Sequence, residues 1–402
     1  MAPRLRSGSA LHNVLPEEAL RVVMLSLPVD ARARAACVCR AWRAFLADVS
    51  LWQVLDLTPA GGVVAERVTE NLVRGAVARA AGRLRSFSFV GQPVWHVDRF
   101  FVRLMHSDGA ELQEVNAAMW MNRRLLEEVL AAAPRLQVLG TGVSGPCAEL
   151  LAMARNSPPY GPVRLSRLRL WDTVAAEAAD VLALAASLAS HEKLKRMDVS
   201  DLPFARGLTA LLGVAAEQRV SHLTLIRCTL DAECTSALAR LLRRGTLTTF
   251  KMSHCRGFLR DADCIPILCA SLRTCRTLTH LQLLFSLPVG AEEHTVTELI
   301  DAVGSLPALS ELEMDFGEVH DTLACGRALG ALLAANLPNL RSLDVEDCLL
   351  GDDGTAPLLD GLAANTHLRE LKCDEDDLSE EFKRARLNPA LVALAARAAF
   401  GV

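Results

Sequence analysis

The sequence predicts an α/β protein in which a small all-helical region is followed by a long solenoid of alternating strands and helices. The pattern L-x-x-L-x-L, with conservative replacements, recurs from position 84 onward about every 28 residues. The intervals between copies carry leucine, alanine and isoleucine at helical spacing and stop near glycine, proline or asparagine. The chain is 51% hydrophobic but only 4% aromatic, which favours stacked helices and short strands over an aromatic-rich sandwich. We therefore expect a solenoid in which stacked strands alternate with helices along the chain.

The repeated pattern predicts the position of each strand. Its copies begin at Leu84, Leu112, Leu136, Leu165, Leu194, Val220, Leu247, Leu278, Leu309, Leu340 and Leu368. These copies resemble leucine-rich repeats of the ribonuclease-inhibitor type. The resemblance implies a horseshoe in which each repeat adds one parallel strand to the concave face and one helix outside. The segment Trp52-x-x-Leu55-x-Leu57 fits the same pattern, so we expect an additional strand before residue 84.

Three cysteines share one position in the repeat, three residues past the last apolar residue: Cys228, Cys255 and Cys348. A small residue there can lie under the turn and bond its backbone, so we interpret these cysteines as structural. A catalytic cysteine would need a base at a defined distance. His254 precedes Cys255, but adjacent residues in a strand or tight turn point to different sides. None of the twelve cysteines has metal-ligand spacing.

Residues 11–57 form the predicted helical region. Pro16 suits a first helical turn, where its missing N–H costs nothing. The apolar face of this first helix is expected to hold Leu20, Val23, Met24 and Leu27. Pro28 ends the helix, and Asp30 is expected to cap a second one. The apolar face of the second helix is expected to hold Ala35, Val38, Trp42 and Phe45.

The same region resembles an F-box in four features of its residue order. They are Leu15-Pro16-Glu17-Glu18, Val38-Cys39-Arg40-x-Trp42, Trp52, and Leu55-Asp56-Leu57. The resemblance implies docking to a Skp-family adaptor, which links such domains to a cullin scaffold. The adaptor-binding residues it implies are Leu15, Pro16, Leu20, Val38, Cys39, Trp42 and Trp52. The alternative is a helical cap for the downstream repeats, with both tryptophans buried inside it.

Three residues depart from the usual F-box pattern near the start of the second helix. Arg32, Ala33 and Ala35 stand where members of the family usually carry larger aliphatic residues. A change from leucine to alanine at a buried site costs on the order of 2–5 kcal/mol. These departures predict a weaker affinity for the adaptor.

The concave face should be formed by the variable positions of the strands, and it changes sign along the chain. The candidate substrate-binding residues are Arg167, Arg169, Trp171, Arg196, Lys251, Glu311, Glu313, Asp315, Asp344 and Glu346. The first of these are mostly basic and the last are acidic, which suits a polypeptide ligand that also carries both signs. The alternative is that these side chains are merely solvated.

The predicted organisation is a short tail over 1–10, the F-box over 11–57, a connector with the first repeat helix over 58–83, about eleven repeats over 84–378, and a C-terminal capping helix over 379–402. The last repeat should be covered by Leu391, Leu394, Ala395 and Phe400. No dinucleotide-binding, phosphate-loop, zinc-protease or serine-hydrolase motif is present, and we expect neither catalysis nor a cofactor.

The net charge of −4 gives no reason to expect nucleic acid, and no apolar run predicts a signal peptide or a membrane span. The expected location is cytoplasmic, nuclear or both. The resemblance implies a substrate-recognition subunit of a Skp-cullin-F-box (SCF) ubiquitin ligase, whose repeat face recruits a target protein for ubiquitination and degradation. The alternative is a leucine-rich-repeat binding or scaffold protein that is not coupled to ubiquitin transfer.

Overall fold

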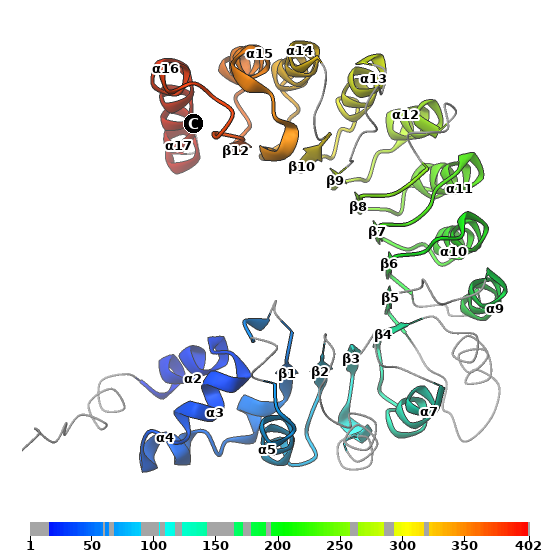
Figure 1. The fold of residues 1–402 in the computed structure, drawn as a ribbon, viewed down its shortest axis with the longest axis vertical. Coiled ribbons are helices and arrows are strands. Elements are labelled where there is room, and N and C mark those ends of the chain that lie inside the picture. The colour runs from blue at the N-terminus through cyan, green and yellow to red at the C-terminus, as the bar shows by residue number, and fades with distance from the viewer. Residues whose placement is uncertain are drawn as a thin grey trace, which may run out of the picture. The chain divides into compact units, whose positions relative to one another are not determined.

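The computed structural model describes residues 16–58, 61–63, 68–89, 104, 109–116, 123–142, 165–171, 178–189, 194–257, 264–284, 293–316 and 321–400. The chain forms two compact units, Met1–Lys193 and Leu194–Val402, and Figure 1 shows the elements of each. No helix of the described segments is both long and apolar enough to cross a lipid bilayer.

The N-terminal unit begins with short helices. They are α2 (Glu17–Ser26), α3 (Val29–Ala35), α4 (Arg40–Phe45) and the 3-10 turn η1 (Val49–Trp52). Helix α2 follows Pro16 and ends before Pro28, as predicted. The predicted second helix is wrong in its length, because it is divided into α3 and α4. Cys39 has an extended backbone with φ −154°, and its Sγ accepts a hydrogen bond from the Trp42 N–H, so it begins a new helix.

The predicted capping role of Asp30 is also wrong. Pro28 occupies the N-cap position of α3 and makes no side-chain capping bond. Asp30 lies in the first turn instead, where its carboxylate accepts a hydrogen bond from Arg34 at 2.7 Å. This ion pair between residues i and i+4 stabilises the helix along its length, and it does not cap the N-terminus.

The strands of the N-terminal unit form one parallel sheet in chain order. They are β1 (Val54–Asp56), β2 (Ser86–Ser88), β3 (Glu114–Asn116), β4 (Val138–Gly142) and β5 (Arg167–Trp171). Beside them stand α5 (Glu70–Ala80), the 3-10 turn η4 (Gly109–Glu111), α7 (Arg123–Ala132) and α9 (Ala178–Leu188). Strand β1 pairs with β2, with Leu55 opposite Phe87, which confirms the predicted additional strand. The sheet therefore starts inside the F-box-like region.

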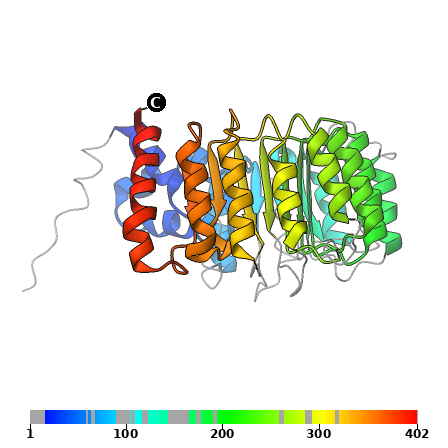
Figure 2. The ribbon, with the colours of Figure 1, turned by 90° about the horizontal axis from the view of Figure 1, so that it is seen from above.

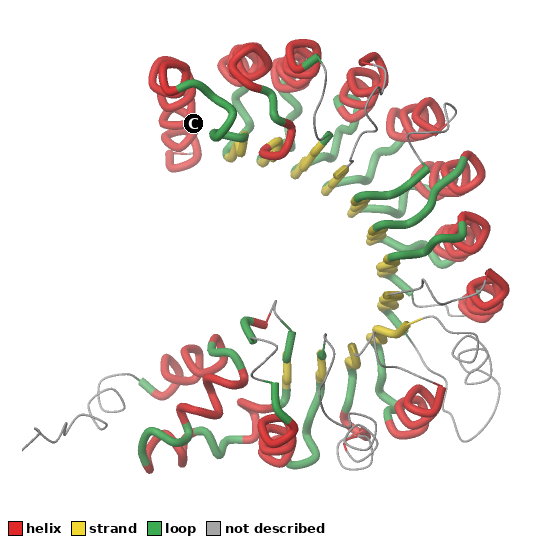
Figure 3. The backbone as a smooth tube through the Cα atoms, in the orientation of Figure 1, coloured by secondary structure: helices red, strands yellow, loops and turns green. Residues whose placement is uncertain are grey.

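The C-terminal unit repeats a strand and a helix. Its strands are β6 (Arg196–Ser200), β7 (His222–Ile226), β8 (Thr249–Ser253), β9 (His280–Leu284), β10 (Glu311–Asp315), β11 (Ser342–Val345) and β12 (Glu370–Cys373), all parallel and paired in order. Its helices are α10 (Ala205–Glu217), α11 (Ala232–Arg243), α12 (Cys264–Thr274), α13 (Glu293–Val303), α14 (Thr322–Ala334) and α15 (Gly351–Ala364). Within this unit the strands lie on the inner side of the curve and the helices on the outer side (Figure 3). Seen from above, these helices stand side by side (Figure 2).

Each of the eleven strands β2–β12 begins two residues after its predicted copy of the pattern begins, so the predicted phase is confirmed. In β7, Leu223 and Leu225 are buried between the sheet and the helices, and Phe250 and Met252 do the same in β8. The alternate residues face the other side of the sheet. The repeat core thus consists of the apolar positions of the pattern, and the variable positions form the inner surface.

The chain ends in a helical segment that covers the last repeat. It comprises α16 (Glu380–Phe382), one π-helical turn η7 (Lys383–Leu387) and α17 (Asn388–Phe400). Leu387 and Leu394 are buried, but Ala395, which was expected to cover the core, is exposed. The guanidinium of Arg397 donates hydrogen bonds to the carbonyl oxygens of Leu362 and Asn365 at the end of α15. It thereby satisfies carbonyl groups that a helix leaves unpaired at its C-terminus.

Candidate functional site

Trp52 is the centre of the helical region. It is fully buried, and its indole Nε1 donates a hydrogen bond to the Leu46 carbonyl oxygen at 2.8 Å. The guanidinium carbon of Arg32 lies 5.7 Å from the centre of its ring, and that of Arg79 on α5 lies 5.1 Å away. Both distances are in the range of cation–π contacts. The residue therefore joins the F-box-like helices to the first repeat helix.

Arg32 belongs to the same interior. Its side chain is buried and donates hydrogen bonds to the carbonyl oxygens of Leu27, at 3.1 Å, and Leu51. Burial lowers the pKa of its guanidinium. Ala35 is buried as well, whereas Ala33 is half-buried. Because Arg32 and Ala35 contribute to internal packing, they do not by themselves imply a weaker contact with an adaptor.

The predicted adaptor-binding residues are separated by the fold into different environments. Leu20 and Trp52 are buried, Cys39 and Trp42 are half-buried, and Pro16 and Val38 are exposed, Val38 by 61%. Leu15 lies outside the described residues. The exposed and half-buried members can touch a partner directly, whereas Leu20 and Trp52 cannot do so without a change in the fold.

Helix α2 carries an apolar surface that the sequence reasoning missed. Val22 and Leu25 are 68% and 50% exposed, and Val23 is also exposed, although it was predicted to lie on the buried face with Leu20 and Met24. Val22 and Leu25 are three residues apart and are therefore neighbours on the helix. The signal in the sequence is that α2 is apolar on two faces, whereas a surface helix normally has one. We call Val22, Val23 and Leu25 the α2 patch.

In the N-terminal unit, the predicted substrate-binding arginines are engaged within the sheet. Arg169 lies 3.7 Å from a carboxylate oxygen of Glu114 on β3 and is largely buried. Arg167 is half-buried on the same strand, and Trp171 is the last residue of β5. The side chain of Trp171 lies outside the described part of the structure.

The inner surface of the C-terminal unit contains a groove of about 330 Å³ over strands β8 to β12. It is lined by Lys251, His280, Leu281, Gln282, Glu311, Leu312, Glu313, Ser342, Asp344, Glu370 and Lys372. The imidazole Nε2 of His280 lies 3.1 Å from Glu311, and the ammonium of Lys372 lies 3.0 Å from Asp344. Hydrogen bonding to Asp344 raises the pKa of Lys372.

Four of the predicted substrate-binding residues meet in this groove: Lys251, Glu311, Glu313 and Asp344. Arg196 is instead paired with Asp198 on its own strand at 3.2 Å, and Asp315 and Glu346 are not part of the lining. The prediction omitted His280, Gln282, Ser342, Glu370 and Lys372. They occupy the same variable positions of the pattern as the predicted residues, so the phase of the repeats also places them on the concave face.

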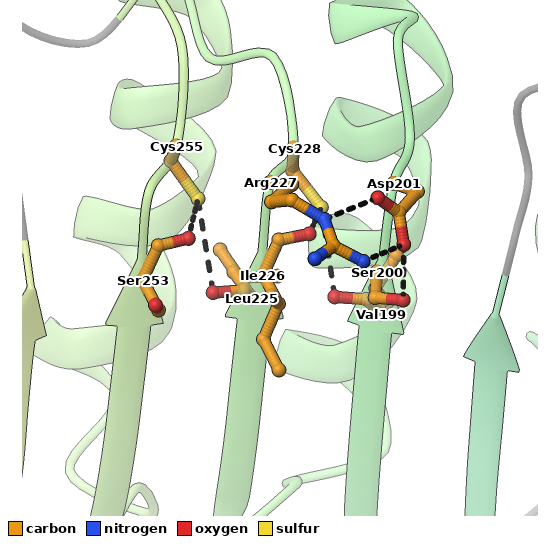
Figure 4. A network of polar contacts seen from close by, with 9 residues as sticks. All are labelled: Val199, Ser200, Asp201, Leu225, Ile226, Arg227, Cys228, Ser253 and Cys255. Atoms are coloured by element: carbon orange, nitrogen blue, oxygen red, sulfur yellow. Dashed lines mark hydrogen bonds and ion pairs between the residues drawn. The ribbon is translucent and has the colours of Figure 1, made fainter. Parts of the chain in front are cut away.

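The three cysteines in matching phase hold neighbouring repeats together. The Cys228 thiol donates to the carbonyl oxygen of Val199 at 3.6 Å, and the Cys255 thiol donates to that of Leu225 at 3.7 Å (Figure 4). The Cys348 thiol donates to the Met314 carbonyl at 3.1 Å. Each thiol thus bonds the backbone of the preceding repeat. Cys228 and Cys255 also make the predicted bond within their own turn, to the carbonyl oxygens of Ile226 and Ser253. In the described residues no cluster of three or more histidine, cysteine or acidic side chains could hold a metal.

Burial also makes three cysteines of the C-terminal unit poor nucleophiles. It raises the pKa of Cys234 to about 11, that of Cys325 to about 12, and that of Cys348 well above its usual range. Cys37, in contrast, is exposed.

We expect limiting N-ethylmaleimide at neutral pH to modify Cys37 first and Cys234, Cys325 and Cys348 only after unfolding, because the thiolate is the reactive form. Peptide mass mapping checks this. Cys37→Ser should remove the fast reaction, and fast labelling of a buried repeat cysteine would instead favour a nucleophile there.

The chain is similar to a known family over its helical region and, distantly, to solved structures over most of its length. A family model described as F-box-like matches residues 12–58. In the crystal structure of the Rad7 and Elc1 complex in yeast, a chain matches 87% of this chain over 80% of its own length, with 16% identity and a TM-score of 0.48. The leucine-rich repeat-containing protein LegL7 from Legionella pneumophila matches 77% of this chain over 91% of its own, with 12% identity and a TM-score of 0.38.

Both structural likenesses are distant, and the assignment of the two regions rests on the family match and on the repeats themselves. Residues 12–58 match the F-box-like family, and each strand–helix repeat carries the leucine pattern at its buried positions. The chain thus carries an F-box-like domain at residues 12–58, followed by strand–helix repeats of the leucine-rich type.

Proposed function

We propose that the chain is the substrate-recognition subunit of an SCF-type ubiquitin ligase. The observation that carries the proposal is the F-box-like domain at residues 12–58, because such domains bind a Skp-family adaptor that connects them to a cullin scaffold. The repeat surface would hold the target protein. The chain itself would supply no catalytic group, and it would act in the cytoplasm, the nucleus or both.

The α2 patch supports the adaptor interaction. Scattered exposed apolar residues are ordinary on protein surfaces, but Val22 and Leu25 adjoin each other on one helix. Burying each such side chain in a partner would contribute roughly 1.5–3 kcal/mol. Val38, at the junction of α3 and α4, adds another exposed apolar side chain within the matched domain.

Rate enhancement would come from proximity. A target held on the repeats meets the charged ubiquitin-conjugating enzyme at an effective concentration that free diffusion does not provide. The first strand, β1, is paired into the sheet of the repeats, so the adaptor-binding helices and the first repeats belong to one compact unit. Such a connection would hold the docking helices in a fixed orientation to the first strands.

The experiment compares adaptor binding by the full chain and by Val22→Glu/Leu25→Glu. We expect the wild type to co-elute with a purified Skp-family adaptor in size-exclusion chromatography. The double variant should lose at least 100-fold in affinity, because two carboxylates would be buried against an apolar partner surface. Its melting temperature should stay within about 2 °C of the wild type, since both side chains are already exposed.

Val392→Glu is the matched control, because Val392 is 70% exposed but lies on α17 at the other end of the chain. It should bind like the wild type. A wild type that fails to bind at micromolar concentration would contradict the ligase proposal. It would favour the alternative, a repeat protein with a helical cap, for which the burial of Trp52 against α5 provides a structural reason.

A further inference from the structure

The groove over β8 to β12 has an ordered charge pattern, formed by the first two variable positions of each strand. The strand register aligns Lys251, Gln282, Glu313, Asp344 and Lys372 in one row across the sheet. Beside it runs a second row, Thr249, His280, Glu311, Ser342 and Glu370. The first row therefore has an ammonium group at each end and carboxylates between them.

Some of these charges are neutralised within the protein. Lys372 pairs with Asp344, whose other carboxylate oxygen accepts the Glu346 N–H at 3.2 Å. In the second row, the imidazole Nε2 of His280 contacts Glu311. Glu313 stands between Gln282 and Asp344 in the first row, and no described cation forms an ion pair with it. Lys251, on β8, is likewise without an ion pair to any described residue.

The dimensions of the groove limit what it can hold. Its volume of about 330 Å³ is at the lower end for ligand sites and accommodates side chains or a short extended segment rather than a folded domain. Neighbouring strands are about 4.8 Å apart, so Lys251 on β8 and Glu313 on β10 are separated by roughly 10 Å across the sheet. An extended polypeptide advances about 3.3 Å per residue and covers this distance in about three residues.

We propose that this groove binds an extended segment of the target polypeptide, with an arginine or lysine side chain at Glu313 and an aspartate or glutamate side chain at Lys251. The two charged residues of the segment stand two to four positions apart. This inference rests on the proposed function, in which the repeat surface holds the target. Charge complementarity favours this occupant, because the carboxylates of Glu311, Glu313 and Glu370 repel nucleic acid and anionic lipid.

The probe for this proposal is a phage-displayed library of random heptapeptides, selected on the immobilised full chain without any adaptor. Selected sequences should be enriched at least fivefold in arginine or lysine, with an acidic residue two to four positions away. On Glu313→Lys the basic preference should disappear and acidic residues should take its place. On Lys251→Glu the acidic preference should disappear while the basic one remains.

Glu381→Lys is the matched control. It makes the same change in net charge at an exposed residue of α16 that does not line the groove. It should select the same sequences as the wild type, which separates the groove from general attraction of cationic peptides to a chain with net charge −4. Thermal melting of both groove variants should match the wild type, since the two side chains lie at the surface of the sheet and are not buried.

The proposal is overturned if the wild type selects no sequence above background, or if Glu313→Lys and Glu381→Lys change the selected sequences equally. Because the selection contains no adaptor, its outcome is independent of adaptor binding by the α2 patch. If peptides are enriched but no adaptor binds, this inference stands and the ligase proposal is rejected. If an adaptor binds but no peptides are enriched, the ligase proposal stands and this inference is rejected.

Discussion

Trp52→Ala is expected to lower the free energy of unfolding of the N-terminal unit by about 3–5 kcal/mol, the usual cost of truncating a buried aromatic side chain. The ring lies close to the guanidinium groups of Arg32 and Arg79, and its Nε1 donates a hydrogen bond to the Leu46 carbonyl oxygen. Its loss would leave a cavity, a buried guanidinium without its aromatic neighbour, and a carbonyl without its indole donor. Natural domains are stable by only about 5–15 kcal/mol, so this change removes a large part of the total.

Hydrogen exchange measured by mass spectrometry locates the effect. In Trp52→Ala, amides of α2, α3 and α4 should lose protection, whereas those of α10 to α15 should keep it. Adaptor binding should also fall, but through loss of structure, unlike in Val22→Glu/Leu25→Glu. Trp42→Phe is the control, because the Trp42 Nε1 is buried without a hydrogen-bond partner among the described residues. We expect Trp42→Phe to leave the free energy of unfolding unchanged or slightly higher, because it removes that N–H. A decrease equal to that of Trp52→Ala would contradict the central role of Trp52.

The phase of the repeats could be predicted from the sequence because many copies constrain it at once. A strand has a period of two, so a slip by one residue would move every leucine of a repeat to the wrong face. Eleven copies make such an error improbable, and β2–β12 all begin at the predicted place. The strand β1 followed from the same argument, since Leu55 and Leu57 are buried like the leucines of the later repeats.

The helical region was predicted less well because single helices lack that repetition. Periodicity alone assigned Val23 to the buried face of α2, and it also joined α3 and α4 into one helix. The division at Cys39 depends on a thiol that caps α4, which is an uncommon capping group. Arg32 stands where an aliphatic residue is usual, and the sequence does not reveal that its long side chain reaches two carbonyl groups inside the unit.

The residues that line the groove were predicted in part. The pattern identifies the variable positions, and it placed Lys251, Glu311, Glu313 and Asp344 on the inner surface; their binding of a substrate stays a prediction. The sequence does not show which of these charges form ion pairs, because the pairing depends on side-chain rotamers on neighbouring strands. Arg196 illustrates this, since its partner Asp198 lies two residues away on its own strand.

Gly326→Ala is expected to destabilise the C-terminal unit by about 2–3 kcal/mol, the upper part of the range for overpacking. A Cβ at Gly326 would lie 2.6 Å from the Gly354 carbonyl carbon and closer still to its oxygen. These atoms belong to the backbone of α15, so the contact can be relieved only by moving one helix away from the other. Gly330 and Gly361 form another such close approach between α14 and α15. The two helices therefore pack backbone against backbone.

Alanine normally stabilises a helix interior by about 1 kcal/mol relative to glycine, so the sign of the effect tests the packing directly. Gly213 in α10 is the matched control, because a Cβ there would meet nothing within 4 Å. Gly213→Ala should raise the denaturant midpoint of the C-terminal unit, and Gly326→Ala should lower it. If both substitutions were stabilising, α14 and α15 would be free to separate. Opposite signs would instead mean that the spacing of these two helices, and with it the placing of β10 and β11 under the groove, depends on residues without side chains.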